Sequence, residues 1–501
     1  MNIKEIKLGL HIPLFSASLV TILVGAPLLG LIGVWLFAAQ DQPVPPFLRV
    51  AHAHLSWWSM SLLISSLIMP ALSLKRQVKR IITAGAFFTL LLYPLFVVLH
   101  YYSVPGKLSL PLVGELFVTP YGLAAFISEI VFFIAMVVLS LLAAGVRFPR
   151  LLNNINEPTR YELVSNISVP RKLFGVYAFF LSLSVFIGLY ILTFFTLSYK
   201  PISPAALVQF HTHVGMFAVG FVMTILAMRA IGAAHSKWQL TYSVGVVALT
   251  ATVLGFLIFI LFNTHSIVWV GPAMLYYGVL VVGWLSLFGK FGLSALGDNY
   301  FHFARWALIL IWGFLLIFTL TGPYLSLRYN KTPDFTVTYK QLDGGIDGKH
   351  VGPYPDPKKD YLGTAPSKNT PRGLENFHLS PGSWSHVAIF WLLILMLFGK
   401  RIFQTIGAPT LLFALAVMIA QAPIINGIGR IGAWAGLPGG IGPLLFVGHP
   451  LKTLNILLLL IVMIVLMVKL RKNTALSHHI TRRKVAVPRE AGKRDESSRG
   501  L

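Results

Sequence analysis

The sequence predicts an all-α membrane protein, a polytopic bundle of about twelve transmembrane helices in three pseudo-repeated four-helix arcs. Of the 501 residues, 56% are hydrophobic and only 11% are charged. Those values are typical of proteins with many membrane spans rather than of soluble domains. The formal net charge is +24, but the basic residues gather in short connections between apolar runs and in the tail. We therefore expect a lipid bilayer, and no nucleic acid, as the partner of this charge.

Apolar runs of about twenty residues mark the expected helices. The first run, from Leu14 to Ala39, is too long for the core of a signal peptide. The weakest run is interrupted by Gly407 and Pro409, residues that break helices. In chain order the expected spans are approximately 14–39, 48–74, 81–102, 118–146, 173–198, 207–232, 239–263, 266–290, 303–328, 384–403, 404–424 and 445–470.

The basic connections predict the orientation of the bundle. Positive charge is concentrated at 75–80, at 147–172 and at Lys400 and Arg401, and such loops usually stay in the cytoplasm. With an even number of spans, both termini are then cytoplasmic, and we expect a multi-pass protein of the cytoplasmic (plasma) membrane. The transmembrane bundle covers residues 1–471 with an extracytoplasmic loop at 329–383, and residues 472–501 form a basic cytoplasmic tail.

The chain contains no cysteine. This excludes disulfides, thiolate-ligated haem, covalently attached c-type haem and iron–sulfur clusters. Non-covalent haem and copper held by nitrogen remain compatible with the composition.

Two His-x-His pairs are the strongest functional signal. His52 and His54 stand in RVAHAHLSWW, and His211 and His213 stand in VQFHTHVGMF, each at the mouth of an expected span. An imidazole inside a bilayer is costly unless a partner satisfies it, and it is the usual protein ligand of haem iron and copper. Residues two apart on a helix point about 200° from one another. Each pair can therefore serve two sites on opposite sides of its helix.

A third histidine occupies an equivalent place. His386 opens the span 384–403, as the two pairs open spans 48–74 and 207–232, and a proline-containing approach precedes each of them. We interpret this as a weak internal threefold repeat of about four helices per unit. With one histidine of each pair facing the next unit, we expect a six-coordinate site between spans two and six, and a second between span two and His386.

Other polar residues extend this candidate site. Arg49 lies one helical turn before His52 and is a candidate partner of haem propionates. Glu129 lies within the span 118–146, where an ionised carboxylate is costly, and we expect it to be protonated, paired or part of a proton path. Trp57 and Trp58 fit either a stack beside a haem or an aromatic belt at the membrane interface.

These residues resemble the haem–copper oxidase superfamily, specifically its twelve-helix catalytic subunit I. The match by position is His52 or His54 on helix two, His211 or His213 on helix six, His265 at helix seven and His386 on helix ten. The stretch FHTHVGMFAVGF is also similar to the nitric oxide reductase and cbb3-type branch and to NnrS-type membrane proteins. The resemblance implies non-covalent b-type haem, one to three per chain, with copper as a further cofactor held by histidines of this set.

The chain departs from the family pattern in its ligand set. Helix seven offers the single His265 where a histidine pair is expected, helix ten offers only His386, and no tyrosine follows the helix-six histidines at the crosslinking distance. These departures indicate a divergent relative that lacks a standard oxygen-reducing site.

The first functional hypothesis is a membrane-embedded haem-binding, electron-transferring oxidoreductase subunit of a respiratory chain. Its electron partner would be a quinol or an extracytoplasmic electron-transfer protein, and we expect further membrane subunits beside it. The alternative is a transporter or sensor of a metal, haem or a small ligand that uses the same histidines. A purely structural subunit is the third reading. The histidines cluster at one face rather than at helix breaks in mid-membrane, which favours the first hypothesis over transport.

Overall fold

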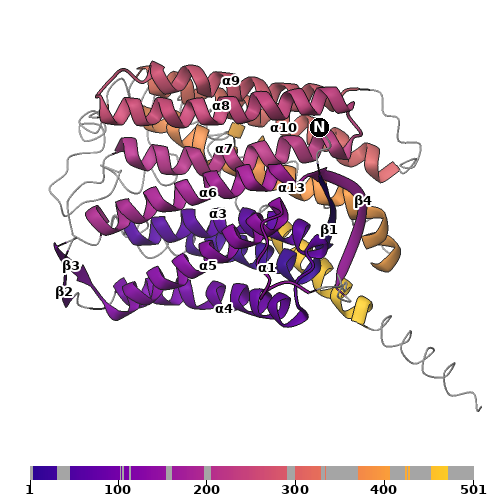
Figure 1. Cartoon of the computed structure of the whole chain (residues 1–501), viewed down its shortest axis with the longest axis horizontal. Helices are drawn as coiled ribbons and strands as arrows, with labels where there is room; N and C mark the ends of the chain where they lie inside the picture. Colours follow the sequence, from indigo (N-terminus) through magenta and orange to yellow (C-terminus); the bar gives the residue numbers. More distant parts are fainter. Residues whose placement is uncertain are drawn as a thin grey trace, which may run out of the picture.

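The structure is a computed structural model, and it is built almost entirely of helices (Figure 1). It describes residues 4–30, 46–101, 103, 106–111, 114–153, 161–196, 205–289, 299–328, 333, 371–406, 424–425, 427–428 and 453–471. Within these ranges, nine helices are long and apolar enough to cross a membrane. This identifies a multi-pass membrane protein with a lipid bilayer as its environment.

The described residues of the N-terminal part of the bundle form four α-helices. They are α1 (Ile12–Leu23), which continues as the π-helical turn Val24–Leu28, then α3 (Pro46–Ile68), α4 (Arg76–Tyr101) and α5 (Pro120–Ala144). The bounds of α5 follow from its caps. The Thr119 side chain accepts from the backbone N–H of Gly122, and Gly145 ends the helix with a φ of 103°, a left-handed conformation that favours glycine.

The middle part of the bundle also contains four helices. They are α6 (Arg171–Ile191), extended by the π-helical segment Leu192–Thr196, then α7 (Ala205–Ala230), α8 (His235–Leu261) and α9 (Ile267–Ser286). These eight helices lie within a few residues of the expected spans, except that residues 31–39 of the first span lie outside the described part. The helices α1 and α3 are not among the nine that are long and apolar enough to cross a membrane.

In the C-terminal part, the described residues form α10 (Asn299–Arg328), α13 (Pro371–Ile406) and the span Thr453–Arg471. The helix α13 begins well before the predicted residue 384 and continues through Pro381 and Gly382, so part of the expected loop at 329–383 is helical. Almost all of the expected span 404–424 and the tail 472–501 lie outside the described residues. The described chain thus supports a helical membrane bundle, while a count of twelve helices in three arcs remains a prediction.

Two small antiparallel sheets flank the bundle, which the all-α prediction did not include. Strand β1 (Glu5–His11) pairs with β4 (Glu162–Pro170), and β2 (Gly106–Leu110) pairs with β3 (Gly114–Val118) in the connection between α4 and α5. Figure 1 shows the two sheets at opposite ends of the bundle. Each sheet therefore marks one end of the helices.

Helices α7 and α13 form the centre of the bundle. The most apolar stretch of α7 is 72% buried and that of α13 is 83% buried, whereas the other seven candidate spans are 22–44% buried. The outer helices expose large apolar side chains such as Phe88, Val131 and Phe186, as expected for surfaces that face lipid. Both histidine-bearing central helices are thus shielded from lipid by their neighbours.

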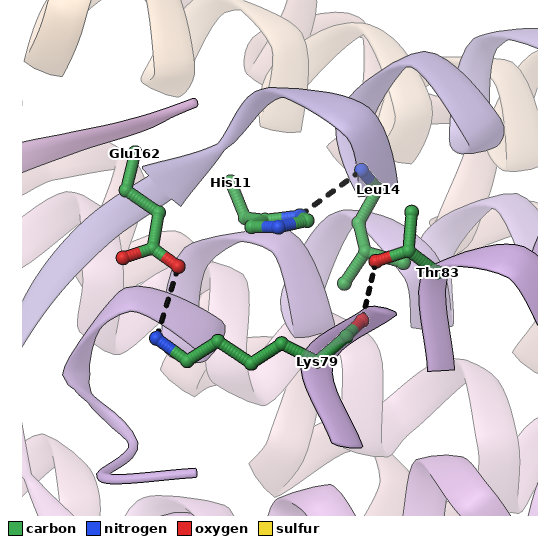
Figure 2. A network of polar contacts seen from close by, with 5 residues as sticks. All are labelled: His11, Leu14, Lys79, Thr83 and Glu162. Atoms are coloured by element: carbon green, nitrogen blue, oxygen red, sulfur yellow. Dashed lines mark hydrogen bonds and ion pairs between the residues drawn. The ribbon is translucent and has the colours of Figure 1, made fainter. Parts of the chain in front are cut away.

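The end marked by β1 and β4 is closed by charged side chains (Figure 2). Lys79 Nζ on α4 lies 3.0 Å from Glu162 Oε1 on β4, and both side chains are buried. Arg229 at the end of α7 pairs with Glu5 on β1 at 3.0 Å. These contacts attach the sheet to two helices of different parts of the bundle.

His11 belongs to this same end. Its Nδ1 accepts the backbone N–H of Leu14 and so caps the first turn of α1. Burial, together with the positive charge of Lys79, lowers the pKa of His11 to about 4. His11 is therefore a neutral structural acceptor at physiological pH.

Candidate functional site: two facing pairs of imidazoles

Three histidines bind a backbone carbonyl of a helix that stands earlier in the chain. His52 Nδ1 on α3 lies 2.6 Å from the carbonyl oxygen of Gly25, and His211 Nδ1 on α7 lies 2.6 Å from that of Ser184 on α6. In each of these two pairs, the histidine and its partner are 27 residues apart in the sequence. His378 Nδ1 on α13 lies 2.8 Å from the carbonyl oxygen of Phe318 on α10, with a separation of 60 residues that includes the long connection between these helices. The same contact therefore recurs in all three parts of the chain.

A glycine completes the contact in two of the three cases. Gly188 and Gly322 stand four residues after Ser184 and Phe318, the residues whose carbonyls accept. A Cβ at Gly188 would come within 2.6 Å of Cε1 of His211, and one at Gly322 within 2.7 Å of Cε1 of His378. Each imidazole therefore packs directly on the backbone of the neighbouring helix, and any side chain at the glycine would displace the ring.

His54 faces His211 across the contact between α3 and α7. Their ring centroids are 6.0 Å apart, and the ring planes are nearly perpendicular at 79°. The Nδ1 atom of His54 lies 2.9 Å from Oε1 of Glu129 on α5. The two atoms are within ion-pair distance, although they are not aligned as a hydrogen bond. The carboxylate that the sequence placed within a span is thus paired with one of the candidate histidines.

His213 faces the opposite way from His211, as the two-residue spacing predicted. Its ring centroid lies 6.2 Å from that of His378 on α13, with the ring planes at 19°. Its Nδ1 lies 2.8 Å from the backbone oxygen of Gln209. The ring also contacts Phe256 of α8 and Trp269 of α9. Helix α7 therefore carries one imidazole toward α3 and another toward α13.

The Nδ1 contacts decide which nitrogen of each ring carries the proton. A backbone carbonyl can only accept, so Nδ1 must be the donor in His211, His213 and His378. The lone pair of a neutral ring is then on Nε2. Histidines that bind metals typically donate their other ring nitrogen to a carbonyl or carboxylate in this manner.

His386 lies deeper along α13 than His378. Its Nδ1 donates to the carbonyl of Gly382 at 2.9 Å, within the same helix. Its Nε2 lies close to Gly220 of α7: a Cβ added to this glycine would be 3.3 Å from Nε2. The hydroxyl of Tyr276 approaches the same point. The helix begins at Pro371, so His386 does not open it, and the residue that repeats the contact of His52 and His211 is His378.

His265 stands apart from the buried rings. It is exposed in the connection between α8 and α9, and its Nδ1 accepts the backbone N–H of Ile267 at 3.2 Å. Among the described residues, no group of three or more His, Cys, Asp or Glu side chains is arranged to hold a metal ion. In the part of the chain that the structure describes, His265 therefore does not join His211 and His213 in such a group.

Of the two tryptophans that follow His54, Trp58 is buried and Trp57 is partly buried. Trp58, one turn after His54, stacks on Phe132 of α5 with centroids 4.6 Å apart and contacts Tyr93 of α4 at the same distance. It is fully buried, so it belongs to the interior and not to an interfacial belt. The side chain of Arg49 on α3 lies outside the described residues.

His378 was missed by the sequence reasoning because it lies in a segment interpreted as loop. A signal was present: NFH at 376–378 matches QFH at 209–211, with the histidine in the same place. The two glycines, four residues after the accepting carbonyls, repeat as well. Comparisons of the chain with protein-family models, with curated proteins and with solved structures found no match.

Proposed function

We propose that this chain is a membrane-embedded haem-binding subunit for electron transfer, with a non-covalent b-type haem held between His54 and His211. The observation that carries the proposal is the facing arrangement of these two rings, 6.0 Å apart on separate helices. With metal–nitrogen bonds of about 2.0–2.1 Å, two imidazoles on opposite sides of one ion have centroids roughly 6 Å apart. The spacing thus fits a shared iron.

The surroundings of the two rings fit the same role. His211 is anchored by Ser184, whose carbonyl accepts from its Nδ1 and whose hydroxyl donates to its backbone oxygen at 2.8 Å. Glu129 lies beside His54 Nδ1, as carboxylates do that orient metal-binding histidines. A haem needs only two protein ligands, so the lack of a three-residue metal group among the described side chains does not bear on it.

If His54 and His211 both hold the haem iron, no protein-free position would remain on it for a substrate. A haem bound in this way supplies one-electron transfer rather than chemistry on a bound ligand. The chain's own contribution is to orient the rings, to hold their protons on Nδ1 and to exclude water by burial between helices. We therefore favour electron transfer over an oxygen-reducing oxidoreductase activity, and haem alone over haem with copper.

The charge distribution and the predicted topology support a membrane location and an orientation for this electron transfer. The histidine pairs lie toward the ends of α3 and α7 that follow the extracytoplasmic connections in the predicted topology, and the basic connections lie at the other end. We propose a plasma-membrane location with both termini in the cytoplasm. A quinol or an extracytoplasmic electron-transfer protein would then exchange electrons at the histidine-bearing side, with further membrane subunits as partners.

Haem content tests the proposal directly. The full chain is purified in detergent with haem supplied during expression, and its absorption spectrum is recorded in the oxidised and reduced states. We expect a Soret band and a reducible α-band, both weakened in H54A and H211A and unchanged in H265A, the exposed control. A wild-type protein without a Soret band, or single variants with full haem content, would contradict the proposal.

A further inference from the structure

We infer that the chain holds a second haem, between His213 of α7 and His378 of α13, in a site equivalent to the first by internal repetition. This inference rests on the proposed function and extends it to a ligand pair that the sequence analysis did not contain. The two irons would lie on opposite sides of α7, because residues 211 and 213 project in opposite directions from it.

The second pair has the same spacing as the first. The centroids of His213 and His378 are 6.2 Å apart, compared with 6.0 Å for His54 and His211. Both values agree with two imidazoles on opposite sides of one ion, roughly 6 Å. The Nδ1 atoms of His213 and His378 both lie 2.8 Å from backbone oxygens, so in each neutral ring the lone pair that can bind a metal is on Nε2.

The two pairs are also built in the same way. In each, one ring is the histidine that binds the carbonyl of the preceding helix and packs on a glycine, namely His211 on Gly188 or His378 on Gly322. The other ring is the second histidine of the previous His-x-His pair, His54 or His213. Each site therefore joins one part of the chain to the next, and α7 contributes to both.

The environment of the second pair contains unused polar atoms. Gln209 Oε1, in the turn before His213, is buried without a hydrogen-bond partner among the described residues. The same is true of Nε1 of Trp269, whose ring centroid lies 5.7 Å from that of His213. Buried polar groups are nearly always satisfied, so these atoms point to a polar ligand group beside His213.

The orientation of the rings makes the two sites distinguishable by spectroscopy. The planes are nearly perpendicular in the first pair, at 79°, and nearly parallel in the second, at 19°. Two iron d-orbitals of nearly equal energy interact with the π-electrons of the imidazoles. Parallel rings both interact with the same one of these orbitals and so separate the two in energy. Perpendicular rings interact with one orbital each and leave the two energies nearly equal. The oxidised protein should therefore show two low-spin electron paramagnetic resonance signals, one highly anisotropic and one rhombic.

The test is haem stoichiometry combined with these signals in the full-length, haem-loaded protein. We expect two haems per chain in the wild type. H378A and H213A should each hold one haem and lose the rhombic signal, while H211A should lose the highly anisotropic one. H265A is the matched control and should retain both. In H378G, added imidazole should restore the second haem, because it replaces the missing ligand without repairing a structural contact.

The outcomes separate this inference from the proposed function. One haem per chain, lost in H211A and retained in H378A, would overturn the second site and leave the first. A protein without haem would overturn both. Two haems that persist unchanged in H213A and H378A would show that other residues hold the second one, and would overturn the assignment to this pair.

Discussion

Buried polar side chains have different partners at the two ends of the bundle. At the end marked by β1 and β4, the buried ammonium of Lys79 meets the buried carboxylate of Glu162, and Arg229 meets Glu5. At the other end, the imidazoles of His211, His213 and His378 each use one nitrogen on a backbone carbonyl. Opposite charges satisfy one another, which closes the first end. In a neutral ring that donates from Nδ1, the lone pair is on Nε2, the type of atom that binds metals, which makes the histidine end suited to a cofactor.

The largest effect is expected from breaking the buried ion pair. E162Q removes the carboxylate and leaves the ammonium of Lys79 buried without a counter-charge, which typically costs about 3–5 kcal/mol. We expect a marked fall in the thermal unfolding temperature in detergent and no change in haem per folded chain.

The double variant K79M/E162Q is the control for this prediction. It removes both charges and should recover much of the lost stability, since an apolar replacement of a buried pair is often neutral. An E162Q protein as stable as the wild type would mean that the pair does not hold this end together.

Acid should weaken the same end. The pKa of His11 is lowered to about 4 in the folded protein, from an ordinary value of 6.5. Between these values the unfolded chain binds the proton and the folded chain does not, so stability falls as pH falls from 6.5 to about 4. At the lower limit the loss is roughly 2–3 kcal/mol for this one group.

The variant H11N isolates this contribution. Asparagine is a good N-cap that accepts the same backbone N–H but does not titrate. Unfolding measured by denaturant at pH 7 and at pH 4.5 should show a smaller acid loss in H11N than in the wild type. Equal losses in the two proteins would assign the acid sensitivity to other groups.

A methyl group on the supporting glycine should disturb the histidine end alone. In G188A the new Cβ would stand within 2.6 Å of the His211 ring, so the ring must move. Overpacking of this kind costs about 1–3 kcal/mol, and we expect loss of the haem between His54 and His211. G278A is the matched control, because a Cβ at that helical glycine meets nothing within 4 Å. Full haem content in G188A would show that the close packing is not needed.

The smallest effect is expected from the carboxylate beside His54. E129Q keeps the shape of the side chain but removes its charge, and loss of such a partner typically lowers metal affinity by 10–100-fold. Titration of the haem-free protein with haem should give a weaker site, and the reduction potential should rise because a negative charge is lost. E115Q, in an exposed pair with Lys107, is the control. An unchanged affinity and potential would limit Glu129 to packing.

The sequence was sufficient for those features that depend on local pattern. Runs of apolar residues predicted the helices from α3 to α10, and the two-residue spacing predicted that His211 and His213 face different helices. Helix α13 was placed too late because Pro381 and Gly382 are typical of loops, and packing in the bundle outweighed that preference. The pairing of His54 with Glu129, and of His213 with His378, depends on helix rotation and contact between distant segments, which no local pattern contains.

The pairing of β1 with β4 has a consequence for how the protein is made. Glu5 lies opposite Pro170 in this sheet, so β1 pairs with a strand from which it is separated in the sequence by the described helices α1, α3, α4 and α5. Contacts between such distant segments form late, because the intervening chain must first be confined. Formation of this sheet therefore requires that the helices between its two strands have already brought residues 5 and 170 to the same end of the bundle.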